Sequence, residues 1–252
     1  ISIILNAETA RKEKKYAVAE EYYNKMLSSP DIKIIGLRGL LELNLRNQDY
    51  HHALVYAEQI YNINHKLDWI YQTIINILTK TRNWQKLINI NDDAFNKKII
   101  SKNTKQKSNS IAQYEIALIK EKSLIHEALS LLKDANNARP NFPPFVKKYT
   151  KILIDNNQIG KAKDVVFKSW NHEPHLSYFD ELIRISEKEK TDLLLIINKL
   201  ISRNLYCYES IVVKTKAYII EKKWEDAKKI IKPILSNRPN KTTCELMSEI
   251  EF

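Results

Sequence analysis

Glycine and cysteine are scarce in this 252-residue sequence, and both scarcities exclude classes of protein. Only three glycines occur, at positions 36, 39 and 160, so no Gly-x-Gly-x-x-Gly or Gly-x-x-x-x-Gly-Lys segment can bring backbone amides to a phosphate. Nucleotide enzymes of those types are therefore excluded. Cys207 and Cys244 lie 37 residues apart, which fits neither a zinc site nor a disulfide framework and indicates a reducing compartment. The sequence also has no run of 18 apolar residues, so it contains no membrane-spanning helix.

Positive charge predominates in what is present. The formal net charge is +11 and the sequence pI is about 9.4, which favours acidic partners, nucleic acid or an anionic membrane surface. The alternative is that the charge serves only solubility, because lysine and glutamate alternate along most of the predicted helices. No single face collects basic residues without acidic neighbours, so we expect no nucleic-acid partner.

An aromatic residue followed three positions later by a small or apolar residue recurs every 34 residues. The first three instances are Tyr16 with Ala19, Tyr50 with Ala53, and Trp84 with Leu87. Ala128 and Ala162 are again 34 apart, each with a proline twelve residues later, and Trp224, Ala227 and Pro239 repeat the pattern. This is the period of the tetratricopeptide repeat, in which each unit is a pair of helices that must stack on its neighbours to bury its apolar face.

The sequence therefore predicts an all-α protein: a right-handed α-solenoid of about seven tetratricopeptide-like helix pairs plus a C-terminal capping helix. We expect one domain over residues 1–252, with repeats at approximately 1–30, 34–64, 67–95, 110–140, 143–174, 176–204 and 208–239, and a cap at 241–252. Asp49 is predicted to cap the helix that begins at Tyr50, and Asn156-Asn157 to form a left-handed turn. Pro233 is predicted to bend the helix that contains it.

One segment does not follow the repeat. Residues 96–110 are rich in Lys, Asn, Ser, Gln and Thr, and they hold seven residues in excess of the period, so we expect a mobile loop there. Its lysines could form a basic arm that touches phosphate or lipid head groups, or they could simply be solvated. These lysines are Lys97, Lys98, Lys102, Lys105 and Lys107.

Three stretches resemble a known family. They are Gly-Leu-Arg-Gly-Leu-Leu-Glu-Leu from Gly36 with Asp-Tyr-x-x-Ala-Leu-x-Tyr-Ala-Glu from Asp49, then Trp69 at the start of a helix, and finally Trp224-x-x-Ala with Arg238-Pro239 and Cys-Glu-Leu-Met-Ser-Glu-Ile-Glu from Cys244. Together they look like the C-terminal part of the HemY family of bacterial tetratricopeptide proteins, and the likeness covers nearly the whole chain. The flavin-containing protoporphyrinogen oxidase of the same name would need a glycine-rich dinucleotide fingerprint, which is absent.

The resemblance implies a location and a context. Members are implied to be bacterial inner-membrane proteins with two N-terminal spanning helices and a repeat domain, encoded with tetrapyrrole-synthesis genes. The sequence starts at Ile1 without a methionine and in repeat register, so we expect the natural N-terminus, including a membrane anchor, to precede it. On this basis the repeat domain is expected on the cytoplasmic side of the inner membrane, with tetrapyrrole-pathway enzymes as partners.

The first helix of each pair is expected to present side chains to a concave groove. Arginine and lysine there suit carboxylates, amides suit a peptide backbone, and Trp69 could anchor a ligand, although the same positions could be solvated faces only. A carboxylate clamp for chaperone tails is disfavoured, since the first helix offers Ile4 and Glu8 in place of Lys and Asn. The predicted partner-binding residues are Arg38, Glu42, Arg46, Trp69, Gln72, Asn76, Lys80, Lys147 and Lys151.

Catalysis and cofactors are not expected. The adjacent carboxylates Asp92-Asp93 and Glu20-Glu21 diverge by roughly 100° on a helix and cannot act as an acid–base pair. Cys244 is predicted to pack with Met247 in the core, and the four tryptophans, Trp69, Trp84, Trp170 and Trp224, between helices. The sequence thus predicts a non-catalytic scaffold that binds protein or peptide segments. The alternative is a haem or porphyrin carrier that uses His51-His52 or the pair His172 and His175, although no Cys-Pro or Cys-x-x-Cys-His motif occurs. The pair His172 and His175 also resembles a metal site, but the proline between them prevents a continuous helix that would align the ligands.

Overall fold

A computed structural model describes residues 2–237 and 239–251, apart from the side chain of Asp68. It divides into two compact units, Ile1–Ala112 and Gln113–Phe252, and each unit is described here by itself. Ile1, Arg238 and Phe252 lie outside the described residues. Ile1 belongs to the predicted first repeat, Arg238 to the Arg238-Pro239 pair of the family resemblance, and Phe252 to the predicted cap.

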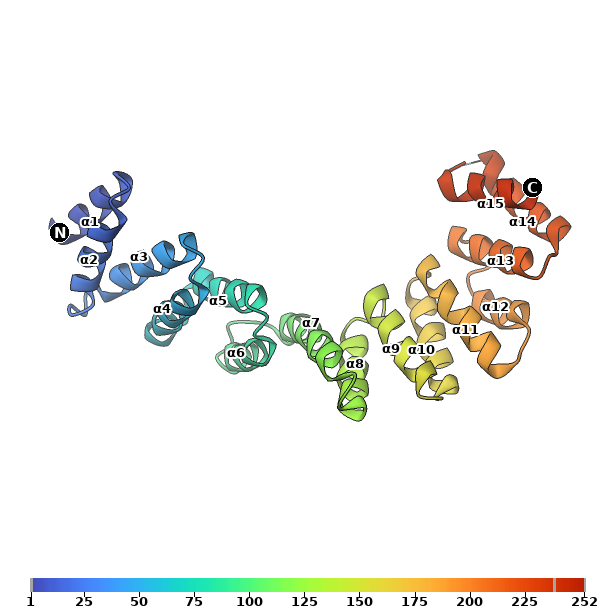
Figure 1. The fold of residues 1–252 in the computed structure, drawn as a ribbon, viewed down its shortest axis with the longest axis horizontal. Helices are drawn as coiled ribbons and strands as arrows, with labels where there is room; N and C mark the ends of the chain where they lie inside the picture. The colour runs from blue at the N-terminus through green and yellow to red at the C-terminus, as the bar shows by residue number, and fades with distance from the viewer. Residues whose placement is uncertain (1, 238, 252) are drawn as a thin grey trace. The chain divides into compact units, whose positions relative to one another are not determined.

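The first unit is a series of helix hairpins (Figure 1). From α1 to α6 each helix packs on the next, and every pair has a first and a second helix joined by a short turn. The helices are α1 (Ser2–Lys12), α2 (Tyr16–Met26), α3 (Lys33–Arg46), α4 (Tyr50–Ile63), α5 (Asp68–Lys80) and α6 (Trp84–Asn96), followed by α7 (Lys102–Lys120), which crosses the boundary between the units.

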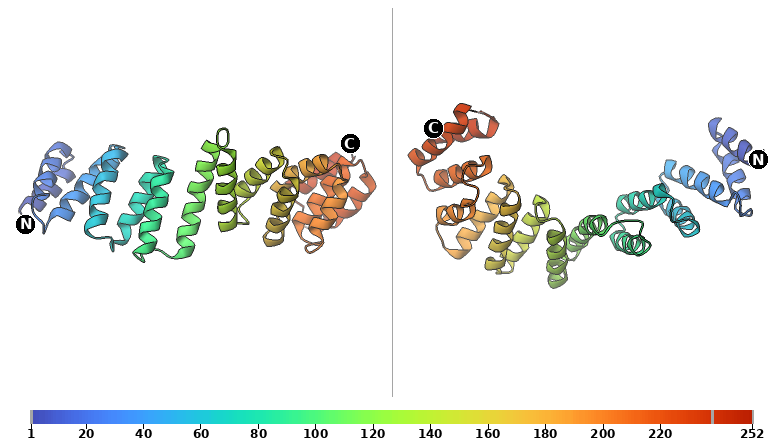
Figure 2. Two further views of the ribbon diagram at one scale, coloured as in Figure 1. Left: turned by 90° about the horizontal axis from the view of Figure 1, so that it is seen from below. Right: turned by 180° about the vertical axis from the view of Figure 1, so that it is seen from behind.

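The second unit repeats the arrangement, and Figure 2 shows its hairpins from two further sides. Its helices are α8 (Ile125–Ala138), α9 (Pro143–Asp155), α10 (Ile159–His172), the 3₁₀ helix η1 (Leu176–Tyr178), α11 (Phe179–Glu189), α12 (Leu193–Ile201), α13 (Tyr208–Ile220), α14 (Trp224–Asn237) and α15 (Lys241–Glu251). Sequential helices again pack on each other, and the first helices α9 and α11 also touch. The prediction of an all-helical stack of helix pairs is therefore confirmed for the residues that the structure describes.

The repeating small residue explains how the pairs close. The fourth residue of the second helix is a fully buried alanine in five pairs: Ala19, Ala53, Ala128, Ala162 and Ala227. A methyl group at this position lets the two helix backbones approach closely, which a larger side chain would prevent. The 34-residue signature in the sequence is thus a packing signature.

The turns inside the pairs share one backbone conformation. Lys14, Gln48 and Arg82 have φ values of 61°, 59° and 53°, and each lies two residues before the second helix of its pair. Asn157, with φ of 60°, takes the same position, as predicted for the Asn156-Asn157 turn. The residue after each left-handed position is the N-cap of the second helix of the pair. At Asp49 the side chain accepts a hydrogen bond from the backbone N–H of His52, which confirms the predicted cap.

Two glycines let α3 pack unusually close to α2. A Cβ atom at Gly36 would lie 2.7 Å from the backbone oxygen of Tyr23, and one at Gly39 would lie 2.4 Å from the ring of Tyr23. Such distances are far inside van der Waals contact. The Tyr23 side chain, which is 1 % exposed, therefore occupies the space that a side chain at position 39 would need.

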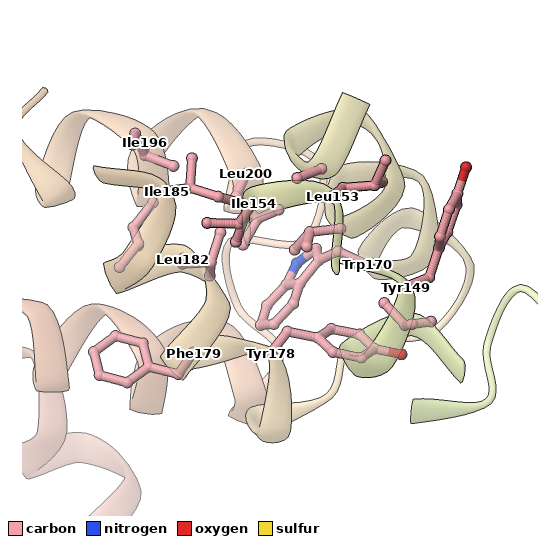
Figure 3. Packing of buried hydrophobic residues seen from close by; sticks show 14 of the residues in the cluster. Tyr149, Leu153, Ile154, Trp170, Tyr178, Phe179, Leu182, Ile185, Ile196 and Leu200 are labelled. Carbon is pink, nitrogen blue, oxygen red and sulfur yellow. The ribbon is translucent and has the colours of Figure 1, made fainter. Parts of the chain in front are cut away.

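The core of the second unit is built from aromatic and aliphatic side chains of α8 to α13. Figure 3 shows the Trp170 indole and the Tyr178 ring among aliphatic side chains from the neighbouring helices. Trp170, Tyr178, Leu182 and Ile185 are fully buried. The predicted inter-helix role of Trp170 is confirmed, and the irregular sixth pair, α11 with α12, belongs to the same core.

The prediction of a mobile loop over residues 96–110 is wrong for the second half of that segment, because α7 already begins at Lys102. The extra residues lengthen the first helix of the fourth pair. Hydrogen bonds from α6 hold the N-terminal half of α7. Asn91, fully buried on α6, donates to Ser108 at 2.8 Å and to Asn109 at 2.7 Å. Lys105 pairs with Asp92 at 2.8 Å. The proposed basic arm is therefore partly neutralised within the first unit.

Two predictions of core packing are also wrong. Cys244 is exposed, because α15 buries Thr243 and Leu246 and brings only Met247 and Ile250 to the edge of that stripe. Trp224 is 42 % exposed, whereas Trp84 at the equivalent position is 8 % exposed. α14 instead packs through Ala227 and Ile231, and it continues as a helix through Pro233.

Candidate partner-binding groove

The first helices of the first unit line a hollow of about 460 Å³. We call it the first-helix groove and define it by its lining residues. Its apolar walls come from Ile4, Ile34, Ile35, Leu67 and Trp69, and its charged residues are Glu8, Arg11, Arg38 and Glu42, with Gly39 between them. All of these residues except Leu67, which precedes α5, lie on α1, α3 and α5 (Figure 1).

Its charged side chains form a continuous chain of alternating sign. On α1, Arg11 donates to Glu8 at 2.6 Å, and across to α3 it lies 4.0 Å from Glu42. Arg38 Nε then donates to Glu42 at 2.9 Å, and the Arg38 guanidinium lies 5.2 Å from the centre of the Trp69 ring on α5. A cation over an aromatic face is attracted by the negative face of the ring. The chain thus connects three consecutive first helices.

A buried tyrosine supports one end of this chain from behind. The Tyr23 hydroxyl on α2 donates to Glu8 at 2.9 Å, and it reaches that carboxylate across the position where Gly39 has no side chain. Hydrogen bonding from Arg11 lowers the pKa of Glu8 against the opposing effect of burial, and the Tyr23 bond adds to the lowering. Burial and the bond to Glu8 raise the pKa of Tyr23 to about 12. Glu8 is therefore an anion and Tyr23 a neutral donor at neutral pH.

The predicted groove residues follow the 34-residue period. Ile4, Arg38 and Gln72 occupy one position of the repeat, and Glu8, Glu42 and Asn76 another. Arg38, Glu42 and Trp69 meet in the first-helix groove, as described above. Of the predicted residues, Gln72 is exposed on α5.

Three further predicted residues lie beside tyrosines at the ends of helices. The Arg46 guanidinium is 3.8 Å from the centre of the Tyr16 ring, and the Lys80 ammonium is 5.4 Å from the Tyr50 ring. Asn76 and Lys80 line a second hollow of about 470 Å³ with Tyr50 and Thr73. The Arg46 and Lys80 side chains thus lie over aromatic rings, while both residues stay exposed to solvent.

Lys147 and Lys151 belong to the second unit, where they lie on α9. Lys147 is 3.7 Å from Asp180 of α11, and Lys151 is exposed. A parallel pair joins the same two helices, since Arg184 of α11 donates to Asp155 of α9 at 2.5 Å. Within the second unit, ion pairs therefore join the first helices α9 and α11.

Carboxylates neutralise the arginines of the first-helix groove, and this changes what the groove can bind. The sequence predicts a basic surface, whereas in the structure Arg11 pairs with Glu8 and Arg38 pairs with Glu42. Among the side chains that the structure describes, none accepts a hydrogen bond from the two terminal nitrogens of Arg38, so its guanidinium can donate to a ligand while Nε stays on Glu42. The groove thus offers donors, a carboxylate acceptor and an apolar wall side by side, which suits a peptide segment better than a simple anion.

Two of the four histidines considered for haem, His52 and His175, make local polar contacts near the start of a helix. His175 Nδ1 accepts from the backbone N–H of Ser177 at 3.1 Å and lies 2.8 Å from the Ser177 hydroxyl oxygen, so this nitrogen is used within its own turn. His52 Nδ1 lies 2.7 Å from Asp49. Over residues 2–237 and 239–251, no group of three or more His, Cys, Asp or Glu side chains is arranged to hold a metal ion.

Sequence reasoning missed Arg11 and Tyr23. Arg11 could have been found from its spacing, because a residue three positions after Glu8 lies on the same helix face. Tyr23 gives no such signal: it lies on a second helix, and only the absence of a side chain at Gly39 brings its hydroxyl to the groove.

No family model matches the chain, and no curated protein matches it. Similar solved structures include the C-terminal part of a tetratricopeptide-repeat protein from Cytophaga hutchinsonii, at 15 % identity and a TM-score of 0.44, covering 97 % of this chain and 99 % of that one. A repeat protein from Bacteroides fragilis has 15 % identity and a TM-score of 0.43, with coverages of 86 % and 97 %. YrrB, described as having an unusual peptide-binding site, has 14 % identity and a TM-score of 0.39, with coverages of 78 % and 99 %. The fold assignment of this chain rests on its own helix pairs.

Proposed function

We propose that this protein is a non-catalytic scaffold that binds a segment of a partner protein in the first-helix groove. The observation that carries the proposal is the chain from Glu8 through Arg11, Glu42 and Arg38 to Trp69 along one wall of a 460 Å³ hollow. Its members are fixed by contacts to each other, so little side-chain entropy is lost on binding.

The expected ligand follows from the groove's lining. An apolar side chain of the partner would pack against Trp69, Ile35 and Leu67, and an adjacent carboxylate or backbone carbonyl would accept from the terminal nitrogens of Arg38. Aromatic and arginine side chains at the centre of a contact contribute most of the affinity in typical interfaces. We therefore place the main contribution at Arg38 and Trp69.

Selection from a displayed library of 12-residue peptides with the purified 252-residue chain tests the proposal. Isothermal titration of the selected peptides should show at least tenfold weaker binding to Arg38→Ala and to Trp69→Ala, about 1.4 kcal/mol or more each. Lys25→Ala is the matched control, because Lys25 is an exposed cation of the same unit on the second helix α2. Equal affinities for all three variants would place the contact elsewhere and reject the groove.

The same titration maps the extent of the site. Charge reversal at Arg46 tests the far end of α3, and charge reversal at Lys147 and Lys151 tests the second unit. Loss confined to Arg38 and Arg46 variants would limit binding to the first unit. Additional loss for Lys147→Glu and Lys151→Glu would extend it to α9.

We further propose, on the sequence resemblance to HemY, that the partners are tetrapyrrole-pathway enzymes. The proposal includes a location at the bacterial inner membrane, with the repeat domain on the cytoplasmic side and an anchor in sequence that precedes Ile1. The support is the three stretches around Gly36, Trp69 and Cys244. No helix within the described residues is long and apolar enough to cross a membrane. Selected peptides that match no exposed segment of a tetrapyrrole enzyme would overturn the partner assignment and leave groove binding intact.

A further inference from the structure

The second unit contains a cavity of about 490 Å³ that belongs to none of the surfaces described above. It lies between the second helices α12 and α14, with the first helix α13 at its base. Its apolar lining consists of Ile201, Leu205, Ile211, Ile230 and Pro233, together with the rings of Tyr206 and Tyr218. We call it the α12–α14 cavity.

The cavity faces away from the neighbouring first helix. On α13, the Lys216 ammonium lies 5.5 Å from the ring of Phe179 on α11, so that face of α13 is directed to the first helices. Lys214, two residues earlier, is about 200° away around the helix and lines the cavity. A ligand in this cavity would therefore be separate from one held by first helices.

Exposed apolar groups mark its rim. Tyr206 is 92 % exposed and Leu205 is 47 % exposed, although both are large side chains in a turn between two helices. An adjoining hollow of about 450 Å³ shares Tyr206, Ile211 and Pro233 with the cavity and continues along α14 to Asn237 and Asn240. The two hollows form one apolar trough that follows α14 from Asp226 to Asn237.

The charges of the trough differ from those of the first-helix groove. Lys214 and Lys229 both line the cavity, and within the described residues neither forms an ion pair, while Lys228 on the same helix pairs with Glu251 at 3.1 Å. The Lys214 ammonium lies 5.8 Å from the ring of Tyr218. Asp226 is the one carboxylate among the lining residues described for the cavity, so its charges sum to +1 with neutral tyrosines.

Pro233 adds an acceptor next to the lysines. Proline has no N–H, so inside α14 it cannot donate to the carbonyl oxygen of Lys229, four residues earlier. The end of the trough near Lys229 thus has two cations and a main-chain acceptor. The opposite end has the side-chain amides of Asn237 and Asn240, and Asn240 accepts from the Tyr208 hydroxyl at 3.1 Å.

From this arrangement we infer that the trough binds a peptide segment of a partner protein that is acidic at one end and apolar in its middle. A large apolar side chain of the segment fills the α12–α14 cavity under Tyr206, and a carboxylate next to it pairs with Lys214 and Lys229. Main-chain groups beyond the apolar residue meet Asn237 and Asn240. A fatty-acid chain fits less well, because its apolar end would lie on these two amides.

The test uses a display library of 12-residue peptides with two fixed glutamates at one end, panned on the purified chain and measured by fluorescence anisotropy. Selected peptides should carry a large apolar residue after the acidic pair. They should bind Lys214→Glu and Lys229→Glu at least tenfold more weakly, and Tyr206→Ala more weakly as well. Lys232→Glu is the matched control, since Lys232 is exposed on α14 and does not line the trough. Arg38→Ala should leave this affinity unchanged.

Three results would overturn the inference: no binder from the library, binders that do not respond to Lys214→Glu and Lys229→Glu, or binders that respond equally to Lys232→Glu. Dodecanoate serves as the competing probe. Saturable dodecanoate binding that is lost in Lys229→Glu, in the absence of peptide binding, would instead identify a site for apolar carboxylic acids. Circular-dichroism melting of each variant confirms that loss of binding is not loss of fold.

Discussion

At the residue scale, a missing side chain organises the first-helix groove. Gly39 has no Cβ, so the Tyr23 ring fits between α2 and α3 and its hydroxyl reaches Glu8. Glu8 in turn holds Arg11, which approaches Glu42. One atom that is absent on α3 thus fixes the order of charges along α1 and α3.

This dependence predicts opposite effects for the same substitution at two glycines. Gly39→Ala should destabilise the first unit by about 1–3 kcal/mol, because its Cβ would overlap the buried Tyr23 ring. Gly160→Ala is the control: no atom lies within 4 Å of its Cβ position on α10, and alanine should stabilise that helix by about 0.5–1 kcal/mol. Urea unfolding of both variants measures the difference. A Gly39→Ala protein as stable as wild type would show that Tyr23 has room to move.

At the scale of helices, the turns of the pairs carry strain that glycine could relieve. The left-handed conformation costs a residue with a Cβ roughly 1–2 kcal/mol relative to its preferred backbone, and Lys14, Gln48 and Arg82 all adopt it. None of these is glycine or asparagine, which explains why residue type predicted the left-handed turn only at Asn157.

Two glutamines of the second pair test this strain with one chemical change. Gln48→Gly should raise stability by up to about 1 kcal/mol, since its φ is 59° and glycine adopts that angle without steric cost. Gln59→Gly, at an exposed position inside α4, should lower stability by about 1 kcal/mol. Thermal unfolding followed by circular dichroism gives the sign of each. Two shifts of the same sign would mean that the turn conformation is not strained.

At the scale of the whole molecule, the chain consists of helix pairs that contact mainly their neighbours in sequence. Stability in such an array is a sum of local terms and nearest-neighbour terms, so a defect should stay local. Each of the two units has a buried apolar cluster of its own: residues 7–43 contribute one in the first unit, and residues 117–217 contribute one in the second.

Leu182→Ala tests this locality in the second unit. Leu182 is fully buried in the cluster of α8 to α13, and its truncation should cost about 2–5 kcal/mol. Amide hydrogen exchange should accelerate in α9 to α12 and remain unchanged in α1 to α4. Equal acceleration in both sets of helices would instead indicate that the whole chain unfolds as one cooperative unit.

The sequence predicted much of the fold and part of the candidate site. The helix at Tyr50 with its Asp49 cap, and the alignment of Arg38, Glu42 and Trp69 on first helices, follow from local periodicity. The helical start of α7 was missed, because polar composition hides a segment whose order depends on contacts such as Asn91 to Ser108. Those contacts join residues from different helices and leave no periodic trace.

What the sequence determined by itself is the all-helical repeat and the positions that its first helices share, because spacing along one helix fixes which side chains lie on a common face. Only the tertiary structure decided which of those charges are paired and that Cys244 and Trp224 are exposed. It also decided that an apolar trough lies along α14, with two lysines that pair with no carboxylate in the described part of the chain. These features depend on how closely and at what offset neighbouring helices pack. That geometry arises from atoms on separate segments meeting in space, which no local pattern records.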